Sequence, residues 1–457
     1  MSHAERAAAF VSDAERTTWH DASLWGVRGK RDAAAAGLPD WEALRAEAAG
    51  IKRHALSRLP ELWEQFEVRA TERGAVVHWA RDAAEHNAIV TGLLESRGAR
   101  RVVKSKSMLT EECGLNAHLE RRGIEVVDTD LGERIVQLRR EPPSHIVMPA
   151  IHLQRGEIGE LFAREMGSPP GLDDPAELTA VARRDMRQRF LAAEAALTGV
   201  NFAVAETGGF VVVTNEGNAD IGSALAPLHI ASVGLEKIVP ERDDLPVFLS
   251  LLARSATGQA ITTYTSHFHG PTAGGGELHI VVVDNGRSRL LGREPYREAL
   301  ACIRCGACMN TCPVYRRSGG HSYESSVPGP IGSVLGPARA PEAHASLPHA
   351  CSLCGSCAEV CPVRIPLVQQ LLAWRGELRA HRPGGRGLAL ALAVAGRLMQ
   401  SAAAYERVGG LMRGVARALP KPLLARLMGA WTRGRAVPEI PDRSFRQLLD
   451  EREGRRG

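Results

Sequence analysis

The sequence has few lysines and few aromatic residues, and it lacks a long apolar run. Lysine occupies six of the 457 positions, so arginine supplies most of the positive charges, and the formal net charge is +5. Aromatic residues make up 5%, which disfavours nucleic acid as a partner because single-stranded sites stack bases on aromatic rings. The longest apolar stretch, Leu388–Ala395, is shorter than the roughly 18 residues that span a bilayer. Met1–Phe10 lacks the apolar centre of a secretory signal. We therefore expect a cytoplasmic, globular protein.

Cysteine is rare over most of the chain and concentrated in one segment. Eight of the nine cysteines lie between residues 288 and 380, and in a reducing compartment such a concentration indicates metal binding rather than disulfides. Both halves of the segment, Cys302–Pro313 and Cys351–Pro362, have the pattern C-x2-C-x2-C-x3-C-P. In ferredoxins with this pattern, the first three thiolates bind one [4Fe–4S] cluster and the fourth binds the other cluster.

This rule predicts the ligands of two neighbouring [4Fe–4S] clusters. The first cluster takes Cys302, Cys305, Cys308 and Cys361, and the second takes Cys351, Cys354, Cys357 and Cys312. Clusters that exchange ligands in this way lie close together, which favours electron transfer between them. Two zinc sites or one purely structural cluster are the alternatives. Zinc is satisfied by paired C-x2-C motifs and does not require a third cysteine at the same interval followed by Cys-Pro.

Composition and apolar spacing divide the chain into four predicted segments. Residues 1–73 are rich in Ala, Glu and Arg and predict a helical N-terminal extension. In residues 74–287, short β-rich runs alternate with amphipathic stretches, which predicts an α/β domain with a parallel sheet. Residues 288–380 form the cysteine segment. Residues 381–457 begin with a hinge-like stretch at 381–385 and predict an Arg-rich helical tail.

Within the predicted α/β domain, several apolar runs predict strands. Gly208-Gly209, flanked by two such runs, predicts a hairpin. The other expected strands are Ala75–Trp79, Arg101–Val103, Ile124–Val127, His145–Ala150, Ile261–Thr265 and His279–Val283. In the cysteine segment, the stretch Val314–Ala350 between the two motifs is long for a compact β-ferredoxin. It favours an α-helical ferredoxin-type domain.

The α/β segment contains polar residues with possible chemical roles. Lys104–Ser107 follow a predicted strand and precede a helix, so they could bind a carboxylate or phosphate; a solvated basic turn is the alternative. Glu206 could be a buried nucleophile, or it could cap a turn. His267 and His269 could bind a metal, but the sequence indicates no third ligand. The turn at Asn215–Asn218 and the thiol of Cys113 are most simply structural.

Several longer segments together resemble one family. They are Lys104–Asn116, Asp128–Glu133, Pro143–Val147, Ala205–Gly208, Thr214–Asn218, Val283–Arg287 and Pro328–Gly332. With the paired cysteine motifs, they resemble the lactate utilization protein B family over about residues 15–440. The sequence departs from the family pattern at Ser266–Pro271 and Gly274–Gly276.

The resemblance implies a LUD domain with a CoA-transferase-like α/β fold, followed by a two-cluster ferredoxin domain. It implies that the eight motif cysteines are iron ligands. It also implies a role in bacterial oxidation of L-lactate to pyruvate with two companion proteins, a further iron–sulfur protein and a LUD-domain protein.

The leading hypothesis is therefore an electron-transfer subunit of an L-lactate-oxidising complex, not a stand-alone catalyst. No G-x-G-x-x-G follows a strand, so the chain shows no flavin or nicotinamide motif for hydride removal. One alternative is a substrate-binding or acyl-transfer enzyme in the LUD domain with auxiliary clusters. Others are an iron–sulfur subunit acting on another 2-hydroxy acid, and a scaffold whose Arg-rich tail contacts partners or an anionic membrane surface.

Overall fold

The computed structural model describes residues 1–272, 274–381, 385–429 and 437–454, and contacts divide the chain into two units. The first unit is Met1–His381 and the second is Arg382–Gly457. The expected hinge falls largely on residues 382–384, which lie outside the described residues. The predicted boundaries at residues 73 and 287 fall inside the first unit and stay predictions.

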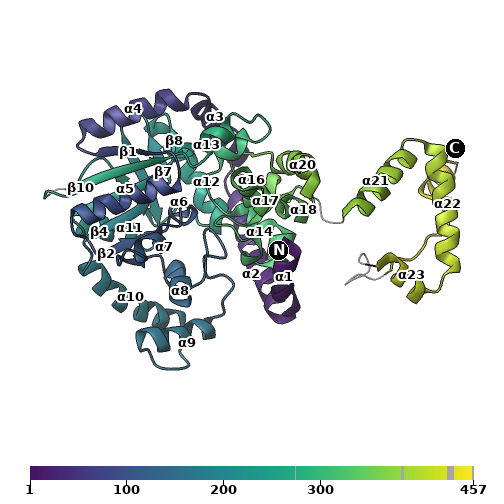
Figure 1. Cartoon of the computed structure of the whole chain (residues 1–457), viewed down its shortest axis with the longest axis horizontal. Coiled ribbons are helices and arrows are strands. Elements are labelled where there is room, and N and C mark those ends of the chain that lie inside the picture. The colour runs from purple at the N-terminus through teal and green to yellow at the C-terminus, as the bar shows by residue number, and fades with distance from the viewer. Residues whose placement is uncertain (273, 382–384, 430–436, 455–457) are drawn as a thin grey trace. The chain divides into compact units, whose positions relative to one another are not determined.

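A six-stranded parallel sheet forms the centre of the first unit (Figure 1). Its strand order is β1-β10-β7-β4-β2-β3. The strands are β1 (Val76–Ala80), β2 (Arg101–Lys104), β3 (Glu125–Asp128), β4 (Ala195–Gly199), β7 (Leu228–Gly234) and β10 (Glu277–Val283). The predicted parallel sheet is confirmed. Its two central strands β4 and β7 were not predicted, because they are buried along their whole length and show no polar alternation.

A second, four-stranded sheet has the order β8-β5-β6-β9. It consists of β5 (Phe202–Val204), β6 (Gly209–Thr214), β8 (Ile238–Val239) and β9 (Tyr264–Phe268). β5 and β6 pair antiparallel around Gly208, which has a φ of 66°. The predicted hairpin is therefore confirmed, with glycine at the position that requires a left-handed backbone.

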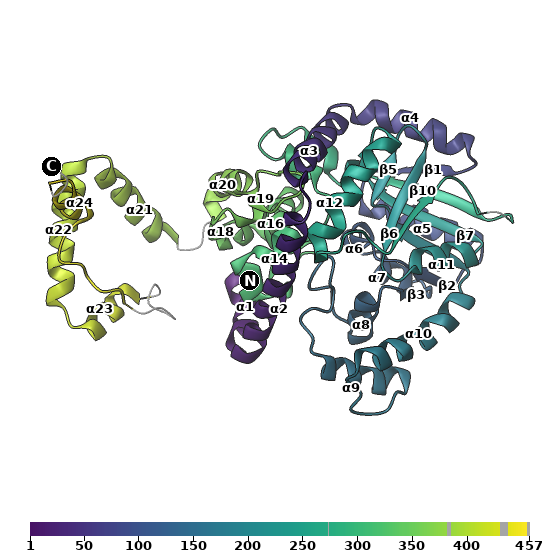
Figure 2. The same cartoon turned by 180° about the vertical axis from the view of Figure 1, so that it is seen from behind.

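Helices and the second sheet cover the two faces of the parallel sheet (Figures 1 and 2). Alternate residues of β10 face opposite sides: Val281 and Val283 pack with α5 (Ala83–Ser96) and α7 (Leu115–Glu120), whereas Ile280 and Val282 pack toward the second sheet and α12 (Leu245–Thr257). The remaining helices of this region are α6 (Met108–Glu112), α8 (Leu131–Arg139), α9 (Arg155–Met166), α10 (Pro175–Leu191), α11 (Asn218–Leu225) and α13 (Arg287–Leu291).

The N-terminal helices connect the sheet region with the cysteine region. They are α1 (His3–Ser12), α2 (Ala14–Ala36), α3 (Trp41–Ser57) and α4 (Leu59–Glu72), which confirms the predicted helical extension. α2 contacts α12 on one side and the cysteine-region helices α14 (Ala307–Thr311) and α15 (Pro313–Ser318) on the other. The extension therefore packs against both predicted domains.

The cysteine region is helical, in short pieces. Besides α14 and α15 it contains α16 (Gly329–Arg339), α17 (Pro341–His344), α18 (Ser346–Ala350), α19 (Ser356–Glu359) and α20 (Leu367–Glu377). Short 3-10 turns occur in the cysteine region at Arg297–Ala301, His321–Tyr323 and Leu378–His381, and in the sheet region at Leu235–Lys237 and Arg242–Asp244. The apolar residues of the cysteine region continue the core that covers one face of the sheet. A single core therefore extends through the sheet region and the cysteine region.

The second unit contains α21 (Gly385–Met399), α22 (Ala402–Ala418), α23 (Lys421–Met428) and α24 (Phe445–Gly454). The predicted helical tail is confirmed for these residues. Among the described residues, no helix combines the length and the apolar character needed to cross a bilayer.

The strand predicted at His145–Ala150 is wrong, because this segment forms turns. The ring nitrogen Nδ1 of His145 accepts hydrogen bonds from the backbone N–H groups of Val147 and Met148, at 3.0 and 3.1 Å. These bonds satisfy locally the backbone groups that a sheet would otherwise pair. His145 and Ile146 are buried, and His145 Nε2 lies 3.0 Å from Asn310 Oδ1 on α14.

Candidate functional site

The two cysteine motifs have the same backbone conformation. In each motif the first sulfur accepts a backbone N–H from two residues on: Arg304 to Cys302 at 3.4 Å, and Leu353 to Cys351 at 3.3 Å. Arg304 and Leu353 have φ values of 63° and 57°, and the glycine after the second cysteine is also left-handed in both motifs. The repeated sequence thus folds into two equivalent loops, each with its first three sulfurs on a tight turn.

The fourth cysteine of each motif lies directly before a proline and also accepts backbone N–H groups. Cys312 Sγ accepts from Tyr315 at 3.5 Å, at the N-terminus of α15. Cys361 Sγ accepts from Ile365 at 3.4 Å. Hydrogen bonds of this kind stabilise a thiolate, the form that binds iron.

The structure brings the fourth cysteine of each motif next to the first three of the other. The pKa of Cys361 is raised to about 11, chiefly by burial and in part by the nearby Cys302. Burial also raises the pKa of Cys305, with Cys361 as the next cause. Cys302, Cys305, Cys308 and Cys361 line one common cavity.

The second group has the same arrangement. Burial raises the pKa of Cys357 to about 12, followed by the charges of Cys312, Cys351 and Cys354. The pKa of Cys312 is raised to about 11, chiefly by burial and in part by the nearby Cys351 and Cys354. The two groups adjoin, because Cys357 also raises the pKa of Cys308.

These thiols fit a polynuclear iron–sulfur group. Buried thiols that raise one another's pKa cannot all be thiolates unless positive charge lies among them, and the irons of a cluster supply that charge. Across the described ranges, no three His, Cys, Asp or Glu side chains converge on one point as ligands of a single ion would. The four cysteines of the first group line a common cavity.

Basic side chains contact the second motif at both of its ends. Arg45, on α3, donates to the carbonyl of Cys361 at 3.1 and 2.8 Å and to that of Glu359 at 2.6 Å. Arg375, on α20, donates to the carbonyl of Cys351. Positive charge and fixed donors next to a cluster favour its more negative, reduced state.

The two groups differ in exposure. Cys305 and Cys361 of the first group are buried, whereas Cys354 of the second group is exposed. The second group therefore lies nearer to solvent at Cys354.

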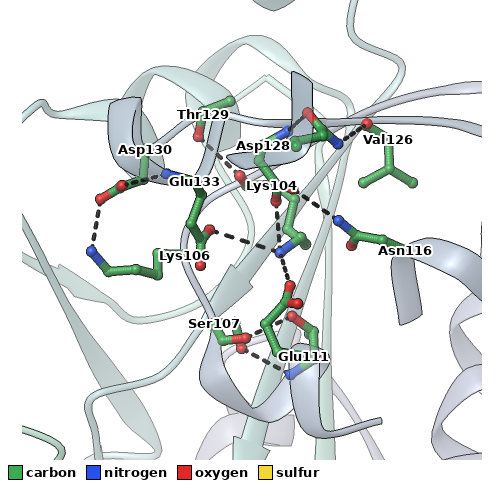
Figure 3. Close-up of polar contacts among 12 residues, drawn as sticks. Lys104, Lys106, Ser107, Glu111, Asn116, Val126, Asp128, Thr129, Asp130 and Glu133 are labelled. Carbon is green, nitrogen blue, oxygen red and sulfur yellow. Dashed lines mark hydrogen bonds and ion pairs between the residues drawn. The ribbon is translucent and has the colours of Figure 1, made fainter. Parts of the chain in front are cut away.

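Lys104, a candidate anion-binding residue, is engaged in a buried ion network (Figure 3). Its Nζ lies 2.7 Å from Asp128 Oδ1, 3.0 Å from Glu111 Oε1 and 3.9 Å from Glu133 Oε2. Burial would lower the pKa of Lys104, but these carboxylates raise it well above its ordinary value. Lys104 is thus a fixed structural cation and does not bind a ligand.

The neighbours of Lys104 have separate roles. Ser105 is buried, and Ser107 caps α6 by accepting from the N–H of Thr110 at 3.3 Å. Lys106 Nζ contacts Asp130 Oδ2 at 2.8 Å and the carbonyl of Val147 at 3.1 Å. Of the four residues, Lys106 and Ser107 line a cavity.

The other candidates of the α/β segment have structural roles. Glu206 is exposed, and it accepts the N–H of Arg242 at 2.9 Å, so it is a capping residue and not a buried nucleophile. His267 and His269 stack with ring centroids 6.3 Å apart, and no third ligand joins them among the described residues. Asn215 accepts from the N–H of Thr263 at 3.3 Å. Cys113 is buried, which raises its pKa to about 12.

A cavity of about 220 Å³ opens where β2, β4 and β7 end. Such carboxyl ends of parallel strands are where open α/β sheets bind ligands. Lys237, Arg304, Asn218 and Cys305 line it, together with Lys106 and Asp130. Sequence reasoning missed Lys237 and Arg304, because they come from a 3-10 turn after β7 and from the first cysteine loop, and only the fold brings them together.

Comparison with known proteins agrees with this organisation. Residues 63–287 match the family model of the LUD domain, and residues 298–365 match that of the 4Fe-4S dicluster domain. The chain therefore has a LUD domain followed by a ferredoxin-like domain, and its cofactors are two [4Fe–4S] clusters.

Curated relatives are similar over most of their length. Lactate utilization protein B of Oceanobacillus iheyensis is 45% identical over 74% of this chain and 72% of its own. That of Macrococcus caseolyticus is 40% identical over 91% and 90%. The Escherichia coli protein YkgF, described as an uncharacterized electron transport protein, is 45% identical over 74% and 72%.

One solved structure also matches part of the chain, a DUF162 family protein from Deinococcus radiodurans. It is 18% identical, covers 49% of this chain and 98% of its own, and has a TM-score of 0.28. From the two family models and the curated relatives, the chain belongs to the lactate utilization protein B family.

Proposed function

We propose that this protein is the iron–sulfur electron-transfer component of a system that oxidises L-lactate to pyruvate. Relatives at 40–45% identity carry the name lactate utilization protein B, and one is described as an electron transport protein. The observation that carries the proposal is that α14 and α19, which hold Cys308 and Cys357 of different cysteine groups, pack against each other. Two clusters held by these groups would lie close enough to pass electrons between them.

The cluster ligands follow the grouping of the sulfurs. The first cluster would be held by Cys302, Cys305, Cys308 and Cys361, and the second by Cys351, Cys354, Cys357 and Cys312. When bound, each cluster supplies a site that accepts and returns one electron. The chain itself holds the thiolates with backbone N–H donors and balances cluster charge with Arg45 and Arg375.

The oxidation itself needs a hydride acceptor, for which this chain has no recognisable motif. Conversion of lactate to pyruvate releases two electrons and two protons, and the two clusters can take the electrons one each. We assign hydride removal to a companion protein, and expect the companions to be a further iron–sulfur protein and a LUD-domain protein. The exposed Cys354 end suits electron exchange with another protein.

The proposal includes finer features of fold and location. The LUD domain would have a CoA-transferase-like arrangement, and the short helices of residues 288–380 would form a helical ferredoxin-type domain. Cytoplasmic location follows from the chemistry of the eight thiols, which need a reducing compartment to stay available for iron.

The test is anaerobic purification with the presumed companions, followed by electron paramagnetic resonance with and without L-lactate. We expect about eight irons per chain and cluster reduction only after lactate is added. Cys361→Ala should lower the iron content, whereas Cys113→Ala, outside the motifs, should leave it unchanged. Zinc in place of iron, or clusters indifferent to lactate in the assembled complex, would contradict the proposal.

A further inference from the structure

The cavity at the carboxyl ends of β2, β4 and β7 adjoins the first cysteine group. Cys305 and Ile146 line both this cavity and the smaller one formed by Cys302, Cys305, Cys308 and Cys361. They form the wall between the two. A molecule in the larger cavity would therefore lie directly beside a ligand of the first cluster.

The cavity has a cationic side whose charges are not fully paired. Arg287, Arg304 and Lys237 surround the carboxylate of Glu236, which is bound by Arg287 and lies 3.5 Å from Arg304 Nη2. Arg304 Nη1 is buried and has no hydrogen-bond partner. In the described part of the chain, no hydrogen bond or ion pair engages Lys237 Nζ. Cationic donors without acceptors favour an anionic ligand beside Lys237 and Arg304, whereas the carboxylates of Asp130 and Glu216 in the same lining disfavour an anion next to them.

A second feature of the cavity wall is an acceptor without a donor. Asn218 is 4% exposed, and its Nδ2 donates to Thr129 Oγ1 at 2.9 Å. Its Oδ1 is buried and has no hydrogen-bond partner. A buried acceptor is costly unless a donor reaches it. A ligand hydroxyl would supply that donor.

We propose that this cavity binds a small carboxylate that also carries a hydroxyl group. Lys237 and Arg304 bind the carboxylate, and Asn218 Oδ1 accepts from the hydroxyl. A cavity of about 220 Å³ suits a molecule of a few carbons. The biological meaning of the site rests on the proposed function, because the ligand would be a substrate of the reaction whose electrons the clusters carry. The proposal concerns binding and assigns no bond-breaking step to this chain.

The same cations have a competing role, which the test must separate. Lys237 and Arg304 also interact with Cys302, so they could serve only to balance the charge of the first cluster. In that case Lys237→Gln would alter the cluster potential and leave ligand binding unchanged.

The experiment is calorimetric titration of the anaerobic, cluster-loaded chain without companions. The probes are L-lactate, propionate, which lacks the hydroxyl, and lactamide, which lacks the charge. We expect L-lactate to bind more tightly than both. Lys237→Gln should weaken L-lactate binding by about tenfold or more, the effect of losing one charge-assisted hydrogen bond. Lys237→Arg should retain most of the affinity, and the exposed Lys30→Gln should retain all of it.

Two further readouts keep the outcome decisive. Asn218→Leu should reduce the preference for L-lactate over propionate, and L-lactate should change the resonance spectrum of one chemically reduced cluster, through Cys305. Iron content identifies any variant that has lost its clusters, and if Lys237→Gln is one of them, Asn218→Leu carries the test. Equal binding of the three probes, or unchanged binding by Lys237→Gln, would overturn the site. The titration needs no electron transfer, so failure of the relay in the complex would leave this result standing, and failure here would leave the relay standing.

Discussion

Lys104 shows how a single residue can be mistaken for a ligand-binding group. It is the last residue of β2, at the sheet edge where ligands bind, yet its side chain is fully buried among Asp128, Glu111 and Glu133. Of its neighbours, Lys106 does reach the cavity. Which lysine of the pair faces the cavity depends on where the carboxylates of β3 and α8 lie, and that is a tertiary property.

Replacement of Lys104 by Met should destabilise the protein by about 3–5 kcal/mol, because it leaves several buried carboxylates without their cation. The free energy of unfolding in urea measures this. The exposed Lys30→Met is the matched control and should change stability by no more than about 0.5 kcal/mol. Equal effects of both substitutions would show that the buried network adds no stability.

His229, on the central strand β7, should make stability depend on pH. Burial lowers its pKa to about 4, and its Nε2 lies 2.8 Å from Thr198 Oγ1. Unfolding restores a pKa near 6.5, so the unfolded chain binds the extra proton between these values. This contribution to stability is fully present above pH 6.5 and is lost as the pH falls toward 4.

The measurement is urea unfolding of the wild type and His229→Asn between pH 7 and 5. The stability difference between them should change by up to about 1.4 kcal/mol per pH unit below pH 6.5, with the wild type losing more. Parallel stability curves would mean that His229 titrates alike in both states.

At the level of elements, the two cysteine loops are equivalent in conformation but not in surroundings. Gly306 and Gly355 have φ values of 77° and 85°. A Cβ on Gly306 would lie 3.0 Å from the His145 ring and 3.1 Å from Val147, whereas one on Gly355 would meet nothing within 4 Å. At these glycines, the first loop is packed against the LUD domain, whereas the second has open space.

We therefore expect Gly355→Ala to cost about 1–2 kcal/mol, the price of a left-handed alanine. Gly306→Ala should cost about 1–3 kcal/mol more, because the methyl group also overpacks the contact with His145. Thermal unfolding and iron content of the two variants test this. If Gly355→Ala proved the more damaging, the packing of the first loop on the LUD domain would be wrong.

The elements also show which patterns were informative. The hairpin at β5 and β6 was predictable because its glycine turn and its apolar strands are local features. The segment His145–Ala150 was misjudged because its burial involves a distant part of the chain, where His145 contacts Asn310 on α14, and because the His145 ring accepts backbone N–H groups of the segment. A buried turn can contain the same apolar residues as a buried strand, so composition alone does not distinguish them.

At the scale of the whole molecule, the first unit contains all nine cysteines, and both predicted domains share one core with the N-terminal helices. The second unit, Arg382–Gly457, contributes no cysteine. The predicted boundary between the LUD and ferredoxin domains is therefore visible in the sequence, but the hydrophobic core continues across it.

A chain ending at residue 381 should retain about eight irons and the midpoint of unfolding of the full chain, because every proposed ligand and its packing lie in the first unit. Iron analysis and thermal unfolding of both forms measure this. Loss of iron in the shortened form would show that the tail supports the clusters, and loss of companion binding alone would assign the tail to assembly.

The sequence by itself predicted the cofactor class and the parallel sheet, because cysteine spacing and apolar periodicity are short-range features, and the pairing of the cysteines stays a prediction. Tertiary structure alone decided that Lys104 is structural, and that Lys237, Arg304 and Asn218 line one cavity beside Cys305. Residues far apart along the chain become neighbours only through the packing of the LUD sheet on the first cysteine loop.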